Sequence, residues 1–282
     1  MRVGYLGPEG TYSHQALLDS GVEVEASALA TLYDTVMAVQ DGIVDAALVP
    51  IENSLEGSVN VTLDTLATDA VDVAIVGETV AEIRNCLIAA RPLELAAIET
   101  VYSHPQANAQ CAQFLRTNLR AARVISTRST ADAVRSVTAD PQAPHAALGN
   151  RLAASLYGGE ILLEDVDDDA GNQTRFVWLA PSSAGDRVRA AIASGGDTKT
   201  SIVFWGAGDG SPGWLVGCLA ELADRAISLT RIESRPRRIG LGHYMFFADF
   251  EGAAADPPVA AAIDGLRKRC EQVRVLGSYR AG

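Results

Sequence analysis

Residues 98–116, IETVYSHPQANAQCAQFLR, decide the fold class. The apolar run at 98–102 is typical of a buried strand, and Pro105 suits the first turn of a helix over 105–116. The same order recurs later, with strands predicted at 123–125 and 146–148 and helices at 130–138 and 150–156. Strands that alternate with helices of about ten residues predict an α/β fold with a mostly parallel sheet.

The N-terminal segment follows the same pattern. We expect a strand at Arg2–Leu6, a helix at Ser13–Leu18 with Ser13 as its N-cap, a helix at Thr31–Gln40, and a strand at Asp45–Ile51 that a proline ends. Two strand-like runs follow between Val73 and Ala90, and another strand is expected at 174–179.

A second unit follows residue 180. Residues 181–197 are rich in Pro, Ser, Gly and Asp and are predicted to be a linker. Strands are then expected at 200–205, 227–233, 243–250 and 273–279, and helices at 213–225 and 256–270. This βαββαβ order predicts a ferredoxin-like domain over 198–282, after a first domain over 1–180.

The composition excludes several classes of function. The 282 residues include 23 Lys and Arg against 35 Asp and Glu, a formal charge of −12, so no nucleic-acid or membrane partner is expected. No apolar run approaches the roughly 18 residues of a membrane span. The four cysteines are widely spaced, which predicts reduced thiols in a cytoplasmic protein. The histidines lack metal-ligand spacing, so no metal is expected.

One glycine-rich loop matches a nucleotide-binding pattern. Gly208-Asp209-Gly210-Ser211-Pro212-Gly213 fits G-x-G-x-x-G, but the short domain leaves no room for a doubly wound sheet. Asp209 would also repel a pyrophosphate. We therefore interpret the loop as a helix start, with Ser211 as N-cap and Pro212 at the first position, whose free N–H groups attract a small carboxylate.

Four polar loops are predicted to meet at one sheet edge, where ligands bind in open α/β sheets. They are 10–13, 53–58, 103–106 and 172–176, and all are rich in hydroxyl or amide side chains. Together they predict a polar small-molecule cleft. Arg175 is the natural anchor for a carboxylate through its planar fork, with an ion pair to the acidic loop 164–169 as the alternative.

These loops resemble the motifs of prephenate dehydratases. Segments 7–13 (GPEGTYS), 50–57 (PIENSLEG), 103–107 (SHPQA) and 174–176 (TRF) match in the order of the family. The C-terminal segment resembles an ACT regulatory domain, and 232–236 (IESRP) matches the phenylalanine-site motif of the family. Trp214 departs from the alanine that is usual at its position.

The resemblance implies a two-lobed catalytic domain, similar to type II periplasmic binding proteins. Lobe I would cover about 1–76 and 161–180, and lobe II about 77–160. The implied reaction converts prephenate to phenylpyruvate, water and carbon dioxide without metal or organic cofactor. The implied protein is the stand-alone form, since no chorismate mutase segment precedes residue 1. It would be a homodimer or homotetramer with L-phenylalanine as effector at ACT interfaces.

The family motifs also imply residue roles. Thr174 would hydrogen-bond or protonate the leaving hydroxide, Arg175 would hold a carboxylate, and Phe176 would pack beneath the ring. The residues expected to line the substrate cleft are Thr11, Ser54, Glu56, Gly57, Ser103, His104, Gln106 and Asn172. Those expected to bind the effector are Ser211, Gly213, Leu215, Val216, Glu233, Ser234 and Arg235.

Two alternatives stay open. One is a dehydratase that prefers arogenate, and the other is a non-catalytic amino-acid sensor, against which the intact Thr-Arg-Phe triplet argues. We also expect a chain that ends near Gly195 to keep some activity but to lose its response to phenylalanine, because every candidate catalytic residue precedes the linker.

Overall fold

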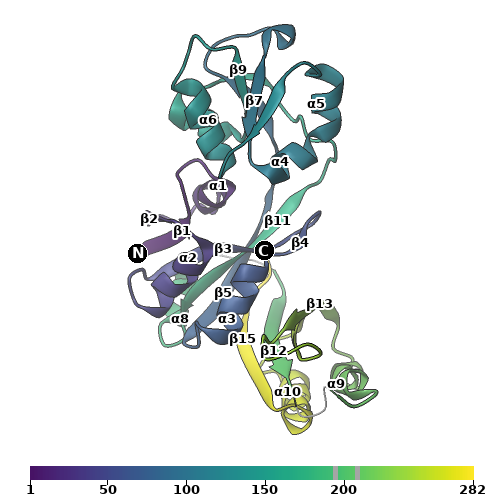
Figure 1. Ribbon diagram of the computed structural model, residues 1–282. Helices are drawn as coiled ribbons and strands as arrows, with labels where there is room; N and C mark the ends of the chain where they lie inside the picture. The colour runs from purple at the N-terminus through teal and green to yellow at the C-terminus, as the bar shows by residue number, and fades with distance from the viewer. Residues whose placement is uncertain (193–195, 207–209) are drawn as a thin grey trace.

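The computed structural model describes residues 1–192, 196–206 and 210–282, which form three sheets. Figure 1 shows these sheets as three layers, with lobe II uppermost, lobe I in the middle and the C-terminal domain below. The two lobes expected of a type II periplasmic-binding-protein-like fold are confirmed, and so is the mixed α/β class.

Lobe I holds a six-stranded sheet in the order β2-β1-β3-β11-β5, with β4 beside β3. Its strands are β1 (Arg2–Leu6), β2 (Glu25–Leu29), β3 (Ala46–Asn53), β4 (Gly57–Ser58), β5 (Val73–Glu82) and β11 (Gln173–Pro181). Its helices are α1 (Tyr12–Asp19), α2 (Leu32–Gln40), α3 (Asn60–Thr68) and α8 (Gly185–Ala191). β1, β2 and β3 are parallel, whereas β11 is antiparallel to both of its neighbours.

Lobe II holds a five-stranded sheet in the order β10-β6-β9-β7-β8. Its strands are β6 (Cys86–Ala89), β7 (Thr100–Ser103), β8 (Arg123–Ser126), β9 (His145–Gly149) and β10 (Glu160–Leu163). Its helices are η1 (Leu95–Ala97), α4 (Pro105–Gln110), α5 (Ala112–Asn118), α6 (Thr130–Thr138) and α7 (Arg151–Tyr157). Two segments connect the lobes, one between β5 and β6 and the other between β10 and β11. A hydrogen bond joins the two segments, in which the N–H of Ile83 donates to the carbonyl of Asn172 at 2.8 Å.

The sheets and lobe boundaries differ from the prediction. Both sheets are mixed rather than mostly parallel, because β11, β6 and β10 run antiparallel to their neighbours. The boundaries lie near residues 82 and 172 instead of 76 and 160. The cause is that β5 continues to Glu82 within lobe I, whereas β10 pairs with β6 and so belongs to lobe II.

Three local predictions are also corrected. The first helix begins at Tyr12 and its N-cap is Thr11, whose Oγ1 accepts the N–H of His14 at 3.3 Å, so Ser13 is already helical. The helix predicted over 105–116 is interrupted at Cys111. Pro50 lies inside β3, next to a shift of register in the pairing with β11 that leaves Ile51 of β3 without a partner there, and this irregularity accommodates a residue without an N–H.

The C-terminal domain is a four-stranded antiparallel sheet, β13-β14-β12-β15. Its strands are β12 (Thr198–Trp205), β13 (Leu229–Pro236), β14 (Tyr244–Glu251) and β15 (Gln272–Arg280), and its helices are α9 (Trp214–Ala223) and α10 (Pro257–Arg269). The chain order is the predicted βαββαβ. The predicted helix start is wrong in detail, because Gly213 rather than Ser211 is the N-cap of α9.

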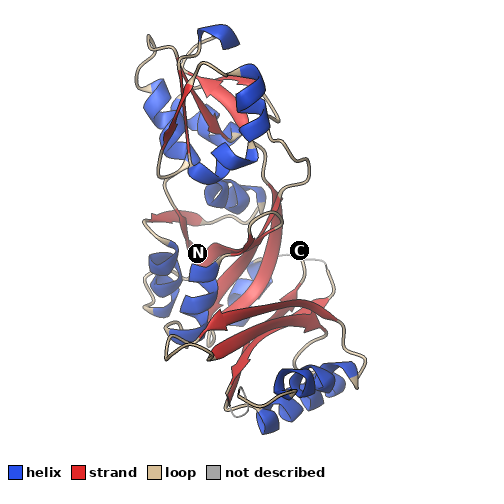
Figure 2. Cartoon of the chain, turned by 45° about the vertical axis from the view of Figure 1, so that its right-hand side comes forward, coloured by secondary structure: helices blue, strands red, loops and turns tan. Residues whose placement is uncertain are grey.

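The C-terminal sheet packs on lobe I with one face and on its own helices with the other (Figure 2). Val203 and Phe247 belong to one hydrophobic cluster with Ile75 and Leu179 of lobe I, and β15 lies against β5. The predicted linker contains α8, which packs Val188 into lobe I. The two domains therefore share a core, and a free linker does not separate them.

Candidate active site

A cleft lies between the lobes and encloses about 290 Å³. The lobe I residues that line it are Leu6, Thr11, Tyr12, Ser13, Leu32, Pro50, Asn53, Val59, Thr174 and Phe176. The remaining lining residues are Ile83, His104, Gln106, Ala107, Gln110, Arg128, Ser129 and Thr130. None of these described lining residues is acidic, although the chain has a formal charge of −12. The cleft is therefore suited to an anionic ligand.

The Thr174 hydroxyl is positioned to donate a hydrogen bond into the cleft. Asn53 Nδ2 donates to Thr174 Oγ1 at 3.0 Å. The Asn53 amide orientation is fixed, because its Oδ1 accepts the N–H groups of Leu55 and Glu56, both at 3.0 Å. An amide nitrogen only donates, so Thr174 Oγ1 is the acceptor in this pair and its own proton remains available to a ligand.

Phe176 is fully buried and lies on the same face of β11 as Thr174. Side chains alternate along a strand, so Arg175 between them faces the opposite side of the sheet. Pro50 of β3 is the cross-strand neighbour of Phe176 and lines the cleft beside it. The cleft therefore has an apolar floor next to a hydroxyl donor.

Arg175 points into the interface with the C-terminal domain. Its Nη2 donates to Asp249 Oδ2 at 2.6 Å, its Nη1 donates to Glu78 Oε2 at 3.2 Å, and its Nε lies 3.1 Å from Glu52 Oε2. Lys199 Nζ donates to Glu78 Oε1 at 2.8 Å. We call these five residues the Arg175 network. Burial opposes the charge of Arg175, but Asp249 and Glu78 outweigh burial, so its pKa is raised and it stays ionised.

The sequence-based interpretation of Arg175 as a carboxylate anchor in the cleft does not match this placement. The guanidinium already has three carboxylate partners and does not line the cavity. The alternative, an ion pair with loop 164–169, is not observed within the described residues either. The reason is that a second domain covers this face of β11, and no residue near Arg175 in sequence signals that packing.

Three other predicted residues do line the cleft: Thr11, His104 and Gln106. His104 is the N-cap of α4, and its Nδ1 accepts the N–H of Gln106 at 3.3 Å. That bond leaves the proton of the neutral ring on Nε2. Burial lowers the pKa of His104 from 6.5, so near neutral pH the ring is uncharged.

Five predicted residues lie outside the cavity lining. Ser54 Oγ accepts an N–H of β11 at 2.9 Å, and Ser103 Oγ donates to a carbonyl of β9 at 3.3 Å. Glu56 and Gly57 are exposed at the turn into β4. Asn172 is buried behind the cleft, where its Oδ1 accepts from Asn53 Nδ2 at 2.8 Å. Ser54, Ser103 and Asn172 thus hydrogen-bond to neighbouring strands or loops, and all five stay predictions as ligand-binding residues.

Sequence reasoning did not name several polar side chains of the cleft, among them Asn53, Gln110 and Arg128. Asn53 lies inside a motif that was singled out for its neighbours. Gln110 ends the helix that begins at Pro105, and its Nε2 is buried without a partner among the described residues. Arg128 directly precedes Ser129, the N-cap of α6. The sequence did offer a signal for each of them. Gln110 and Arg128 lie next to a helix terminus, and Asn53 lies within a motif already assigned to the cleft.

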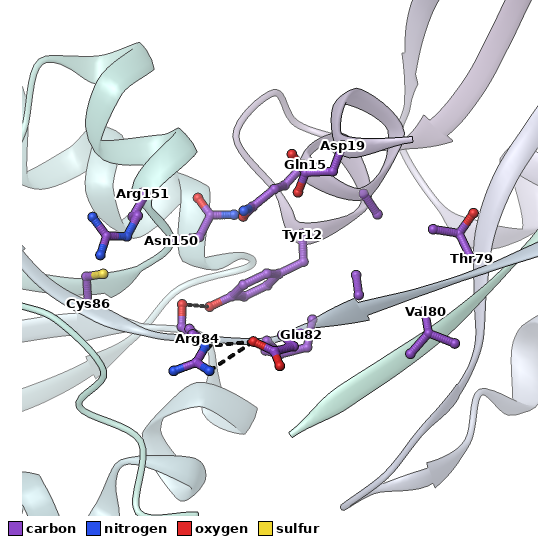
Figure 3. Close-up of a pocket in the computed structure, with 13 residues that line it drawn as sticks. Tyr12, Gln15, Asp19, Thr79, Val80, Glu82, Arg84, Cys86, Asn150 and Arg151 are labelled. Carbon is purple, nitrogen blue, oxygen red and sulfur yellow. Dashed lines mark hydrogen bonds and ion pairs between the residues drawn. The ribbon is translucent and has the colours of Figure 1, made fainter. Parts of the chain in front are cut away.

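A second cavity of about 350 Å³ is lined by residues of both lobes, among them Tyr12, Glu82 and Arg151 (Figure 3). Tyr12 lines both cavities, and its hydroxyl lies 3.0 Å from the carbonyl oxygen of Arg84. Arg84 pairs with Glu82, with Nη2 and Oε2 2.9 Å apart, and Arg151 pairs with Glu164. Both arginines of this cavity are thus paired with acidic neighbours at 2.9 Å or less, whereas Arg128 of the cleft has a longer ion pair with Asp132, at 3.9 Å.

A third cavity, of about 170 Å³, lies at the start of α9 in the C-terminal domain. Four predicted effector residues line it: Ser211, Gly213, Leu215 and Val216. Trp214 also lines it, and its Nε1 donates to the carbonyl of Arg269 at 2.9 Å. Gly208 and Asp209 lie outside the described residues.

The other three predicted effector residues lie along β13, outside that cavity. Glu233 Oε2 accepts from Ser58 Oγ at 2.8 Å, and Arg235 Nη2 donates to Asp64 Oδ2 at 2.9 Å. Ser58 and Asp64 belong to lobe I, so these residues join the two domains. Ser234 between them is exposed.

Three further features concern the chemistry that the chain can support. Within 1–192, 196–206 and 210–282, no group of three or more His, Cys, Asp or Glu side chains could hold a metal ion. The four cysteines are buried and free. None of the helices in these ranges combines the length and the apolar character needed to cross a membrane.

The chain is similar to known proteins over nearly its whole length. The family model for prephenate dehydratase matches residues 3–184. A prephenate dehydratase of Mycobacteroides abscessus is 41% identical, covering 100% of this chain and 90% of that protein. A prephenate dehydratase of Arthrobacter aurescens, solved in complex with L-Phe, is 33% identical with a TM-score of 0.85, covering 99% of this chain and 90% of that one. A solved quorum quenching acylase is 28% identical with a TM-score of 0.83, and the match covers 100% of this chain and 98% of that one.

Proposed function

The chain belongs to the prephenate dehydratase family, and we propose that the cleft between its lobes is the active site. The enzyme converts prephenate to phenylpyruvate, the step that commits prephenate to phenylalanine synthesis. The main observation in support is the position of the Thr174 hydroxyl. Asn53 donates to its oxygen and leaves its proton available to a ligand, and no acidic side chain is among the described residues that line the cleft.

The reaction depends on a hydrogen-bond donor to the leaving group more than on a base. The bond between the ring and its carboxylate breaks, carbon dioxide leaves, and the electron pair enters the ring. The ring C–O bond breaks, and hydroxide leaves with a proton as water. The dianion of prephenate and one proton thus give phenylpyruvate, carbon dioxide and water. Hydroxide is a poor leaving group, so a hydrogen bond that strengthens as charge develops lowers the barrier.

Thr174 is the residue that supplies this hydrogen bond. Because Asn53 occupies the acceptor side of its hydroxyl, the proton of Thr174 can be directed at the leaving oxygen. Phe176 and Pro50 give the planar ring an apolar surface on the same side of the cleft. His104 Nε2–H and Gln110 Nε2, which has no partner within the described part of the chain, add neutral donors from lobe II.

Regulation is assigned to the C-terminal domain, which we take to be an ACT domain with L-phenylalanine as effector. The cavity at α9 supports this role, since it combines an apolar lining with a helix start, and the relative from Arthrobacter aurescens was solved with L-Phe. The edge strand β13 and the exposed Val216, Ile239 and Leu241 support assembly into a homodimer or homotetramer. Four free thiols support a cytoplasmic location.

The test is turnover of prephenate by Thr174→Ala and Thr174→Ser, followed by the absorbance of phenylpyruvate. Thr174→Ala should lower kcat by about 10²-fold or more with little change in KM, on the scale of one lost transition-state donor. Thr174→Ser should retain more activity, and Thr68→Ala, an exposed threonine on α3, is the matched control.

Two outcomes would contradict the proposal. Equal turnover by Thr174→Ala and wild type would remove Thr174 from the chemistry. A wild-type protein that binds phenylalanine but turns over neither prephenate nor arogenate would be the amino-acid sensor. Comparison of kcat/KM for the two substrates decides whether arogenate is preferred.

A further inference from the structure

The cleft must bind prephenate, a dianion, yet Arg175, the cation expected to bind it, does not line the cleft. Arg175 is committed to the Arg175 network on the opposite face of β11. Among the described residues that line the cleft, only His104 and Arg128 are basic. Near neutral pH His104 is uncharged, because burial lowers its pKa from 6.5. Arg128 is therefore the permanent positive charge of the described lining.

Arg128 is accessible to a ligand, because its one ion pair within the described residues is long and its side chain is exposed. Its side chain is 91% exposed, and its closest carboxylate is Asp132, with Arg128 Nε 3.9 Å from Oδ2. Asp132 is already engaged, since its Oδ1 accepts from Arg135 Nη2 at 2.6 Å and its N–H donates to the Ser129 hydroxyl at 3.0 Å. In the ranges that the structure describes, the planar fork of Arg128 has no hydrogen-bond acceptor of its own.

The surroundings of Arg128 favour a carboxylate beside it. Ser129 and Thr130, which also line the cleft, begin the nine-residue helix α6. The start of a helix carries a partial positive charge that adds to the charge of the guanidinium. Arg128 belongs to lobe II and Thr174 to lobe I, so a substrate that contacts both would hold the lobes together.

Resting on the proposed function, we infer that Arg128 binds the carboxylate of the pyruvyl side chain of prephenate. The ring carboxylate leaves as neutral carbon dioxide, so a cation bound to it would stabilise the substrate more than the transition state. The side-chain carboxylate keeps its charge throughout the reaction. A cation bound there contributes affinity without opposing decarboxylation.

The same contact separates prephenate from arogenate. Arogenate carries an ammonium group next to the corresponding carboxylate, and a guanidinium beside that carboxylate repels the ammonium. Prephenate has an uncharged carbonyl at this position. Arg128 therefore sets a preference for the 2-oxo acid over the amino acid.

The experiment compares Arg128→Gln and Arg128→Lys with wild type in the full-length protein. Arg128→Gln should raise KM for prephenate by about 10- to 100-fold, the worth of a charged hydrogen bond, while kcat changes little. Phenylpyruvate retains the side-chain carboxylate, so its inhibition constant should rise by a similar factor. Arg128→Lys should recover part of the affinity, since it keeps the charge but loses the fork.

The control is Arg116→Gln, which removes an exposed arginine of α5 in the same lobe that does not line the cleft. Its KM should equal that of wild type. The preference of Arg128→Gln for prephenate over arogenate should fall below that of wild type.

Three results would overturn the inference. An unchanged KM in Arg128→Gln would show that Arg128 does not contact the substrate. A raised KM with an unchanged inhibition constant for phenylpyruvate would place Arg128 on the ring carboxylate instead. A lowered kcat with both constants unchanged would give it a role other than binding. If wild type itself does not turn over prephenate, the proposed function fails, whereas phenylpyruvate binding measured by calorimetry still tests Arg128.

Discussion

Replacing Arg175 by methionine should destabilise the protein rather than weaken substrate binding. Methionine keeps most of the aliphatic volume but removes the charge between Glu78 and Asp249, whose side chains are each 3% exposed. Removing one partner of a buried ion pair typically costs about 3–5 kcal/mol, because the other charge is left without compensation. Lys199 stays 2.8 Å from Glu78 and Arg231 stays 3.9 Å from Asp249, so we expect the lower end of that range.

The assay is urea unfolding at neutral pH, followed by the fluorescence of the buried Trp178. Arg175→Met combined with Asp249→Asn should cost less than the sum of the single changes, with a coupling of about 1–3 kcal/mol. The matched control is Arg267→Met, which breaks an exposed ion pair with Asp264 whose side chains are 56% and 64% exposed. That change should cost less than about 1 kcal/mol.

The kinetic readout separates this interpretation from direct substrate binding. We expect KM for prephenate to stay close to wild type in Arg175→Met under conditions where the variant is folded. A variant that unfolds at the wild-type urea concentration but shows a KM raised tenfold or more would mean that Arg175 swings into the cleft, and our reading of the network would be wrong.

Four further outcomes are expected. Asn53→Asp should lower kcat by about 10²-fold in the prephenate assay, because a carboxylate accepts the proton that Thr174 otherwise directs into the cleft; wild-type kcat would refute this. Burial lowers the pKa of His14 and His104 from 6.5, so the unfolded chain binds protons that the folded chain does not. The part of the free energy of unfolding that these histidines contribute should therefore be fully present well above pH 6.5 and fall as pH drops below it, less steeply in His104→Asn. A chain that ends at residue 195 should aggregate or unfold at lower temperature, because it exposes the cluster around Ile75 and Leu179; a wild-type Tm would contradict the shared core. Gly213→Val should blunt inhibition by phenylalanine but not basal turnover, since Gly213 lines the α9 cavity with a φ of +82° that valine disfavours.

The order of elements was predictable, but the direction of individual side chains was not. Period-two alternation along β11 already implies that Thr174 and Phe176 share one face and Arg175 the other. Which face borders the cleft depends on the domain packed against the sheet, and that contact comes from distant residues such as Asp249, 74 positions after Arg175. The sequence around Arg175 therefore could not exclude a role in binding.

The missed elements have compositional causes. The segment Glu25–Leu29 has no β-branched or aromatic residue, so β2 is held by pairing with β1 rather than by propensity. Helix α8 lies among Pro, Ser and Gly, which are typical of a linker, and it is stabilised by burial of Val188 in lobe I. In both cases tertiary contacts outweigh a weak local preference.

The two faces of β11 have a consequence for how feedback control can be lost in a growing population. Selection on a toxic analogue of phenylalanine should return escape mutations of two kinds. Those around the α9 cavity, if it is the proposed effector site, would remove effector binding and leave the domain interface intact. Those in the Arg175 network uncouple the C-terminal domain from the strand that carries Thr174, and they remove a buried charge partner at the same time. Strains of the second kind should be temperature-sensitive, so incubation of replica plates at a higher temperature would sort the two kinds before any gene is sequenced.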